Sequence, residues 1–216
     1  SLVFVYHRTE EDIENTKLNL FYLLVNLLLS SLLAIIYTND LFTAYVFVEI
    51  NTMGSCALVM VRYRSGKALV ATLRYMFMSL LGSGLFLLGI CILYGITGHL
   101  LMENIATSVM NLIETGMYQF PLAVVVGLFS MGLAIKSACF PFHTWLPNAY
   151  DNATVATSSI SSGLVLKGYV FLLIKIFYRM FDMSILFEAK AIDVLFVFGI
   201  CAMSAFGTGF VGFPVF

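Results

Sequence analysis

The stretch that decides the fold is residues 122–147, LAVVVGLFSMGLAIKSACFPFHTWLP, in which Lys136 lies inside an almost wholly apolar run and Pro141 follows five residues later. An ammonium group near the centre of a bilayer costs roughly 2.5–3.5 kcal/mol on insertion scales, so intramembrane lysines usually face a protein interior or a wet cavity. Proline removes a backbone donor and clashes with the preceding turn, which kinks or breaks a helix. The stretch therefore predicts a hydrated, broken transmembrane helix with a lysine at the break.

The composition of the chain predicts that it lies in a lipid bilayer. Hydrophobic residues make up 61% of the sequence and charged residues 11%, with a mean hydropathy of +0.97, whereas soluble domains are about 25% charged. We therefore expect an integral membrane protein. The net charge of -1 and the lack of a basic patch argue against a nucleic-acid partner.

The cysteines and the motifs predict no cofactor and no metal site. The four cysteines, Cys56, Cys91, Cys139 and Cys201, are scattered without a C-x-x-C pair, which argues against zinc and iron–sulfur sites. The sequence also lacks a dinucleotide-binding fingerprint and a haem ligand pair. We interpret the cysteines as small apolar packing residues.

Six apolar runs of about 20 residues predict an all-α fold, a polytopic transmembrane helix bundle that forms one domain over residues 1–216. The connections are short. Residues 38–40 form a polar turn, 62–67 a basic loop, and 100–116 are typical of an amphipathic interfacial helix. The expected spans lie near residues 18–37, 41–61, 69–97, 118–140, 155–177 and 192–213.

The basic loop at residues 62–67 predicts the orientation of the protein. It carries Arg62, Arg64 and Lys67, and the positive-inside rule places such a loop in the cytoplasm. We expect a multi-pass protein of a prokaryotic plasma membrane. Both ends of the sequence lie in or beside apolar runs, and the chain begins without a methionine or a signal peptide. We therefore expect a fragment of a longer protein.

Three charged residues, Glu49, Lys136 and Lys167, lie within the expected spans rather than in the connections. One acid and two bases in neighbouring spans favour pairing. Burial lowers the pKa of a lysine, whereas a carboxylate about 4 Å away, worth roughly 4 kcal/mol at an effective dielectric constant of about 20, raises it. A lysine held between these two effects can bind or release a proton when its partner moves by a few ångströms.

Each of these charges also has a structural interpretation. A lysine near the end of a span commonly extends its ammonium group to the lipid headgroups, and we expect this of Lys175 and Arg74. Lys136 and Lys167 would do the same only if the span boundaries were displaced by a turn or more. The other alternative is a static ion pair that holds the helices together.

Two further features have both a structural and a functional interpretation. His143, beside Trp145, is either an interfacial histidine or a participant in proton movement. The run of serine, threonine and isoleucine at residues 157–162 either lets helices approach closely or lines a hydrated approach to Lys167.

Three segments of the chain resemble successive signatures of the antiporter-like, proton-conducting membrane subunits. This family comprises large hydrophobic subunits of respiratory complex I, of membrane-bound hydrogenases and of multisubunit sodium/proton antiporters. The resemblance covers nearly the whole chain, and the lysine followed by P-F-H-T-W-L-P is its most specific part. The segments are NDLFTAYVFVEI at residues 39–50, KSACFPFHTWLPNA at 136–149 and GLVLKGY at 163–169.

The resemblance implies a fold and a set of site residues. The chain would hold about six of about fourteen spans, namely one five-helix repeat with a broken helix and the first helix of an inverted second repeat. Glu49 would be the glutamate that pairs with the lysine of the broken helix, Lys136 that lysine, and Lys167 the base of the following helix. Many members carry a histidine one turn before the position of Lys167, where this chain has Ser161-Ser162-Gly163.

From these observations we expect a subunit that conducts protons, or exchanges them for sodium, through Glu49, Lys136 and Lys167, with His143 as a further candidate. Its expected partners are other membrane subunits of a complex resembling respiratory NADH:quinone oxidoreductase, whose redox chemistry belongs to other subunits. The alternatives are a multisubunit cation/proton antiporter that is not coupled to redox chemistry, a quinone-binding subunit, and a structural membrane scaffold.

Overall fold

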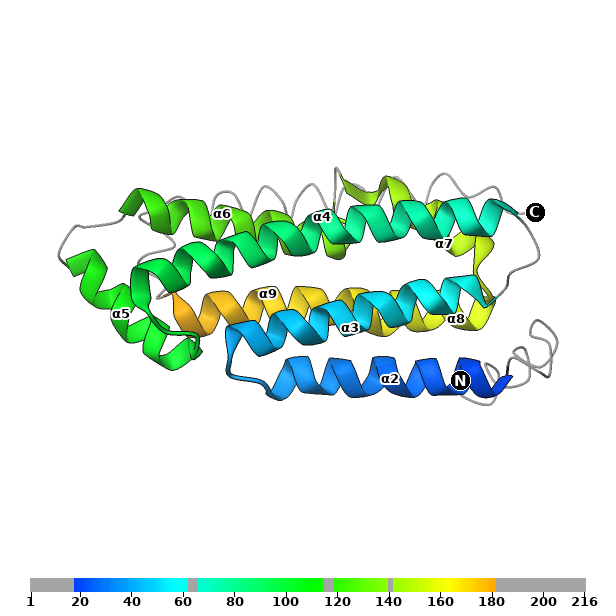
Figure 1. The fold of residues 1–216 in the computed structure, drawn as a ribbon, viewed down its shortest axis with the longest axis horizontal. Coiled ribbons are helices and arrows are strands. Elements are labelled where there is room, and N and C mark those ends of the chain that lie inside the picture. The colour runs from blue at the N-terminus through cyan, green and yellow to red at the C-terminus, as the bar shows by residue number, and fades with distance from the viewer. Residues whose placement is uncertain (1–17, 62–65, 115–118, 140–141, 182–216) are drawn as a thin grey trace.

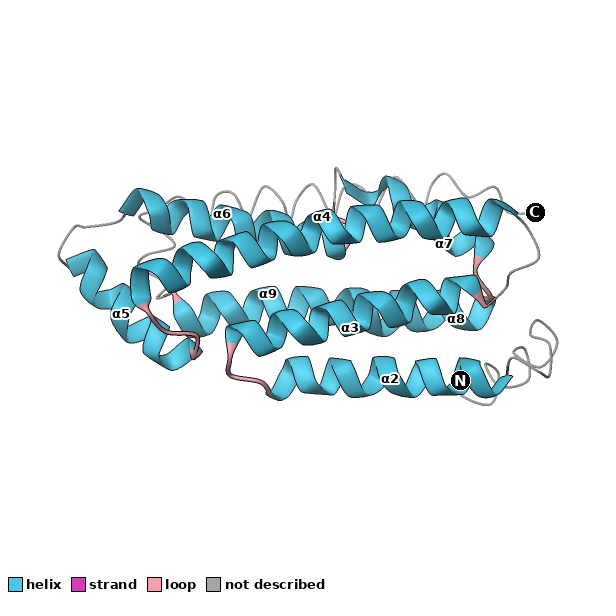
Figure 2. Cartoon of the chain, in the orientation of Figure 1, coloured by secondary structure: helices cyan, strands magenta, loops and turns pink. Residues whose placement is uncertain are grey.

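The computed structural model of the chain describes residues 18–61, 66–114, 119–139 and 142–181. Helices account for nearly all of this part of the chain (Figure 1, Figure 2), which confirms the all-α prediction. The helices are α2 (Leu18–Tyr37), α3 (Leu41–Met60), α4 (Gly66–Thr97), α5 (Met102–Glu114), α6 (Gln119–Lys136), the 3-10 turn η1 (Phe142–Thr144), α7 (Trp145–Asn152), α8 (Val155–Ile160), the π-helical turn η2 (Ser161–Val165) and α9 (Leu166–Met180).

Five of the six predicted spans have a helical counterpart in the described residues. The stretches at 18–37, 41–60, 68–97 and 156–180 are each long and apolar enough to cross a bilayer. The fourth predicted span, 118–140, corresponds to α6, which ends four residues early, at Lys136. The predicted span at 192–213 lies outside the described residues. The helix predicted at 100–116 is present as α5, and its position at the membrane interface stays a prediction.

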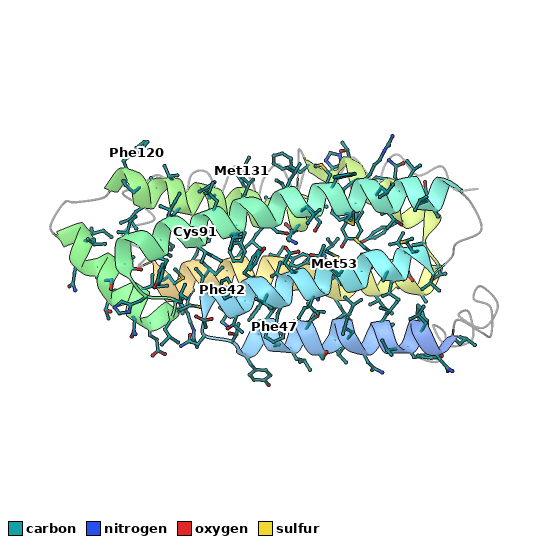
Figure 3. All side chains as sticks on the ribbon, viewed as in Figure 1. Phe42, Phe47, Met53, Cys91, Phe120 and Met131 are labelled. Atoms are coloured by element: carbon teal, nitrogen blue, oxygen red, sulfur yellow. The ribbon has the colours of Figure 1, made fainter. Side chains whose placement is uncertain are left out.

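The bundle is built around α3, which packs between α2 and α4. α4 runs along α6, and α9 contacts α2, α5 and α6. Large apolar side chains project outward from the helices (Figure 3), among them Phe42, Met53 and the 80% exposed Phe120. An apolar exterior of this kind suits contact with lipid, and it matches the composition of the chain.

The polar turn at residues 38–40 begins α3 and anchors α5. The Asp40 carboxylate accepts a hydrogen bond of 2.8 Å from the backbone N–H of Thr43, so Asp40 is the N-cap of α3. The backbone N–H of Leu41 donates to the carbonyl of Leu100, and that of Met102 donates to the carbonyl of Asn39. The turn therefore fixes the start of α5 against the junction between α2 and α3.

Lys175 caps the C-terminus of α2, a contact that the sequence did not predict. Its ammonium group donates to the carbonyl oxygens of Ile35 at 3.3 Å, of Ile36 at 2.7 Å and of Thr38. The last carbonyls of a helix lack intrahelical donors and carry partial negative charge, so they attract an ammonium group. α9 passes close enough to the end of α2 to supply it, whereas Arg74 is exposed, as expected.

We predict that Lys175→Met lowers the stability of the bundle by about 1 kcal/mol, because methionine is an unbranched side chain only one atom shorter but leaves the carbonyls of α2 without their donor. Thermal unfolding of the purified complex in detergent would measure this. Arg74→Met is the matched control, since it removes an exposed cation, and it should unfold at the wild-type temperature. Equal unfolding temperatures for the two variants would contradict a capping role for Lys175.

Candidate functional site

The helix that carries Lys136, α6, ends because Ala138 adopts a left-handed backbone conformation. The backbone N–H of Cys139 donates to the carbonyl of Ala134, and that of Ala138 donates to the carbonyl of Ile135. Ala138 has a φ of 53°, so these bonds form a Schellman motif with an alanine at the position that glycine usually takes. The break lies three residues before Pro141, and it leaves Lys136 in the last turn of α6, where a cation is favoured.

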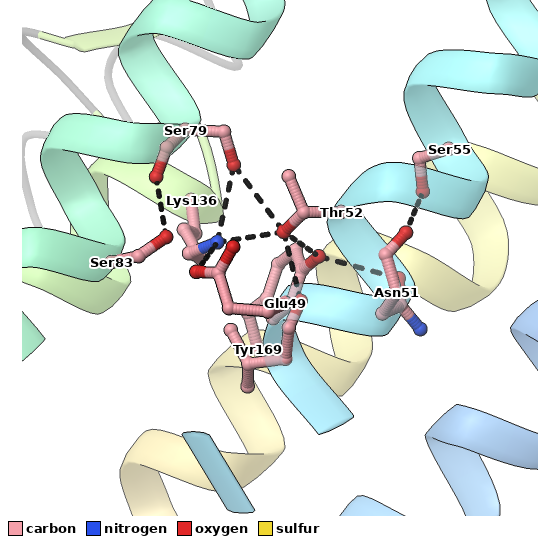
Figure 4. Close-up of polar contacts among 9 residues, drawn as sticks. Glu49, Asn51, Thr52, Ser55, Ser79, Ser83, Lys136 and Tyr169 are labelled. Carbon is pink, nitrogen blue, oxygen red and sulfur yellow. Dashed lines mark hydrogen bonds and ion pairs between the residues drawn. The ribbon is translucent and has the colours of Figure 1, made fainter. Parts of the chain in front are cut away.

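Lys136 is fully buried and points into a cluster of polar side chains (Figure 4). Its ammonium group donates to the hydroxyl of Thr52 at 2.7 Å and to the hydroxyl of Ser79 at 3.2 Å. The Tyr169 ring lies 5.7 Å from the same nitrogen, within range of a cation–π contact. Residues of α3, α4 and α9 thus surround the charge and replace the water that it would have in solution.

Glu49 is the acidic partner of Lys136, as the family resemblance implied. The distance from the Lys136 Nζ to the Glu49 Oε1 is 3.6 Å, and the Glu49 side chain is 22% exposed. This separation is an ion pair but is too long for a hydrogen bond. The short hydrogen bonds of Lys136 go to neutral hydroxyl groups, so the carboxylate is near the ammonium group without being locked to it.

Four neutral residues around the pair were not predicted from the sequence: Asn51, Thr52, Ser79 and Tyr169. The Tyr169 hydroxyl lies 3.4 Å from the Thr52 hydroxyl and donates to the Asn51 side-chain oxygen at 3.3 Å. Thr52 in turn donates to the carbonyl of Val48 at 2.8 Å. A signal was present, since Thr52 lies one helical turn after Glu49, and polar side chains recur along the otherwise apolar α4.

Two glycines allow the close approach of α4 and α6 that buries Lys136. A Cβ atom on Gly132 would lie 2.7 Å from the carbonyl oxygen of Gly82, and one on Gly82 would lie 2.8 Å from the carbonyl oxygen of Gly132. A Cβ atom on Gly82 would also lie 3.2 Å from the Cγ of Lys136. Small residues let helix backbones approach closely in membranes, and here they bring the lysine to Ser79.

The structure does not bring Lys167 into this cluster. Lys167 is exposed on the first turn of α9, whereas Tyr169, two residues later, is buried beside Lys136. The helix predicted as a single span at 155–177 contains the π-helical turn Ser161–Val165, which ends two residues before Lys167. Such turns insert one residue and often occur at functional sites. Lys167 therefore lies on a different face of α9 from Tyr169, which is the residue of this helix that contacts Lys136.

His143 lies in the 3-10 turn η1, just after the break, and it is half-buried. The next element begins with Trp145, which is 5% exposed and stacks on Tyr75 with ring centroids 4.5 Å apart and an interplanar angle of 9°. The stack fixes α7 to α4 and so holds the second half of the broken helix in place. Among the described residues, no group of three or more histidine, cysteine or acidic side chains could hold a metal ion.

The pair formed by Lys136 and Glu49 can bind a proton, and the surroundings of the pair can change its affinity for that proton. A buried ammonium group is favoured by a nearby carboxylate and disfavoured by apolar surroundings. Because the distance between Lys136 Nζ and Glu49 Oε1 is 3.6 Å, slightly longer than a hydrogen bond, a small change in their separation alters that balance. The hydroxyls of Thr52 and Ser79 can accept from an ammonium group and can donate to a neutral amine, so they suit both protonation states.

A buried lysine at a helix break, paired with a glutamate of a neighbouring span, places the chain in a class of polytopic membrane subunits with discontinuous helices. A family model described as NADH:quinone oxidoreductase/Mrp antiporter, TM, matches residues 38–213. The chain belongs to this family.

The relatives include subunits of redox complexes and of antiporters. The chain is 34% identical over 158 residues to the N subunit of the NADH-quinone oxidoreductase of Desulforudis audaxviator, covering 73% of this chain and 30% of that protein. It is 30% identical over 165 residues to a subunit of the Na(+)/H(+) antiporter of Alkalihalophilus pseudofirmus, covering 75% and 32%. The chain spans about a third of the length of these relatives.

The fold is also similar to a chain of a solved archaeal respiratory membrane complex, the membrane-bound sulfane sulfur reductase. The TM-score is 0.67 at 30% sequence identity, over 78% of this chain and 33% of that chain. The relatives that this chain resembles are thus membrane subunits of multisubunit complexes.

Proposed function

We propose that this chain is part of a membrane subunit that translocates protons, or exchanges them for sodium, within a multisubunit complex. The observation that carries the proposal is the buried Lys136 at the end of α6, held 3.6 Å from Glu49 and hydrogen bonded only to neutral hydroxyls among the described residues. A charge this costly in a membrane marks a functional site by default. The names of the relatives, a quinone oxidoreductase subunit and a sodium/proton antiporter subunit, support this class of activity.

In the proposed mechanism, Lys136 is the group that carries the proton. When Glu49 is near, its charge favours the ammonium form. When Glu49 moves away or becomes neutral, the buried surroundings favour release of the proton. Lys167 is proposed as the base that receives the proton after Lys136, on another face of α9 from Tyr169. His143 is proposed as a further proton-carrying group beside the break in the helix. The proposed partners are other membrane subunits, and no residue of this chain is assigned a redox step.

The orientation of the protein belongs to the same proposal. The basic loop at residues 62–67 would lie in the cytoplasm of a prokaryotic cell by the positive-inside rule. The basic loop precedes α4, and Glu103 lies at the start of α5, which follows the other end of α4. Glu103 would then lie on the outer side. Whether the complex moves protons alone or exchanges them for sodium is decided by measuring transport with and without a sodium gradient.

Glu49→Gln is expected to lower proton transport by roughly tenfold while the complex assembles normally. Glutamine keeps the volume of the side chain and removes the charge that favours the protonated lysine, a contribution of at least about 1 kcal/mol. The measurement is acidification of vesicles that contain the full complex, followed with a pH-sensitive dye. Glu103→Gln is the matched control, because Glu103 is exposed and meets Asn39 at 3.3 Å through an oxygen that glutamine retains.

Wild-type transport in Glu49→Gln vesicles with normal complex content would remove Glu49 from the mechanism. If neutral replacement of Glu49, Lys136 and Lys167 each left transport intact, the chain would be a structural scaffold and the proposal would be wrong.

A further inference from the structure

A small cavity lies between α4, α7 and the π-helical turn η2. Its lining includes Tyr75, Trp145, Ala149, Tyr150, Ser161 and Leu166. The space open to the centre of a water molecule is about 10 Å³, which is room for about one water. Val59, in the last turn of α3, also borders the cavity, which places the cavity at this end of α3, about two helical turns beyond Thr52.

Two polar groups at this cavity are buried without a hydrogen-bond partner. The indole nitrogen Nε1 of Trp145 can only donate, and it has no acceptor among the described residues. The Tyr150 hydroxyl oxygen is also buried and makes no hydrogen bond there, although the Ser162 side chain lies beside it. Buried polar groups in folded proteins almost always have a partner, either protein or ordered water. The indole N–H of Trp145 therefore needs an acceptor, and the cavity that the Trp145 side chain lines offers space for one.

We propose that the cavity binds one water molecule, which accepts a hydrogen bond from Trp145 Nε1 and is hydrogen bonded to the Tyr150 hydroxyl, and that this water is a step on the path by which protons reach Lys136. The place of this water on the proton path rests on the function proposed above. The water would take up a proton from the side of α7 and pass another toward α3, so that it is unchanged after each transfer. Trp145 would hold the water in place, and Tyr150 can both donate and accept.

Polar side chains line the interval between the cavity and Lys136. The ring of Tyr75 stacks on Trp145, and its hydroxyl lies beside the Ser55 hydroxyl. Ser55 is one helical turn from Thr52, which accepts a hydrogen bond from Lys136 (Figure 4). Ser79, the second acceptor for Lys136, is one turn from Tyr75 on α4. Hydroxyl groups on two facing helices thus lead from the wall of the cavity to the lysine.

The test compares Trp145→Phe and Tyr150→Phe with Tyr178→Phe in the full complex. Phenylalanine keeps an aromatic ring against Tyr75 but cannot donate, and Tyr150→Phe removes one hydroxyl with little change in volume. Tyr178 is exposed at the end of α9 and serves as the matched control. A structure of the wild-type complex, at a resolution that shows internal waters, should contain density between Trp145 and Tyr150, and Trp145→Phe should lack it.

Both cavity variants should transport protons about threefold to tenfold more slowly at normal complex content, the factor expected for the loss of one hydrogen bond, and the control should not change. An empty cavity in a wild-type map that shows other internal waters would overturn the site. Density at the site with wild-type rates in both variants would overturn its place on the proton path. A complex whose transport does not depend on Lys136 would refute the proposed function, and the density alone would then decide whether the water site exists.

Discussion

Lys136→Ala is expected to reduce proton transport by at least about a hundredfold, the lower end of what a positioned proton-transferring side chain contributes. The alanine removes the only basic group that contacts Glu49, Thr52 and Ser79 in the described part of the chain. It also leaves a space in a buried polar cluster and separates Glu49 from its counter-charge. Some loss of stability should accompany the loss of transport, so the alanine variant alone does not separate the two effects.

Lys136→Arg distinguishes a proton carrier from a static counter-ion. Arginine keeps the positive charge, but its guanidinium group stays protonated, since its pKa in proteins is above about 12. If Lys136 must release a proton, the arginine variant should fail nearly as badly as the alanine variant. If Lys136 only balances the charge of Glu49, arginine should restore much of the lost transport.

The two variants are compared by proton-transport rate per assembled complex, with thermal unfolding measured on the same preparations. An arginine variant that is as stable as the wild type and still inactive would identify Lys136 as the carrier. Arginine performing close to the wild type would reduce Lys136 to a static partner of Glu49. The proton path would then have to depend on Lys167, which the structure places on another surface of α9.

The helices could be predicted from the sequence because their main determinant is local. Apolar runs of about 20 residues fixed α2 and α3 almost to the residue. The end of α6 was predicted less well, because Pro141 indicated a later break while the chain turns earlier, at Ala138. A left-handed alanine has no sequence signature, since glycine is the residue expected at that position.

The charged pair could also be predicted, but its surroundings could not. An acid and two bases in apolar spans have few alternatives to pairing, the family resemblance implied that Lys136 is the partner of Glu49, and these two residues do meet. Thr52, Ser79 and Tyr169 are common residues of membrane helices, and only the packing of α3, α4 and α9 shows that they converge on one nitrogen. The acceptors of Lys175 could not be predicted for the same reason, because they lie more than a hundred residues earlier in the sequence.

The packing of α4 against α6 determines whether Lys136 can reach its partners, and this gives a prediction that does not touch any polar group. Gly132→Ala places a Cβ atom 2.7 Å from the carbonyl oxygen of Gly82 and 3.0 Å from the backbone nitrogen of Phe86. Backbone atoms cannot rotate away as a side chain can, so the two helices must separate. Overpacking of this kind typically costs about 1–3 kcal/mol.

Gly127→Ala is the matched control, because it makes the same substitution in the same helix where nothing lies within 4 Å. Alanine is favoured over glycine in a helix by roughly 0.5–1 kcal/mol, so this variant should be as stable as the wild type or slightly more so. Thermal unfolding and the yield of assembled complex measure the difference. Equal stability of the two variants would mean that α4 and α6 do not approach this closely.

The Gly132 variant should also transport protons more slowly than its residual stability explains. Lys136 lies about one turn after Gly132, and its 3.2 Å hydrogen bond to Ser79 spans the interface that the new methyl group would open. The bond to Thr52 on α3 could survive, since α3 is not part of that contact. Transport per assembled complex should therefore fall in Gly132→Ala but not in Gly127→Ala. A rate equal to that of the control would show that the Ser79 hydroxyl is dispensable for proton movement through Lys136.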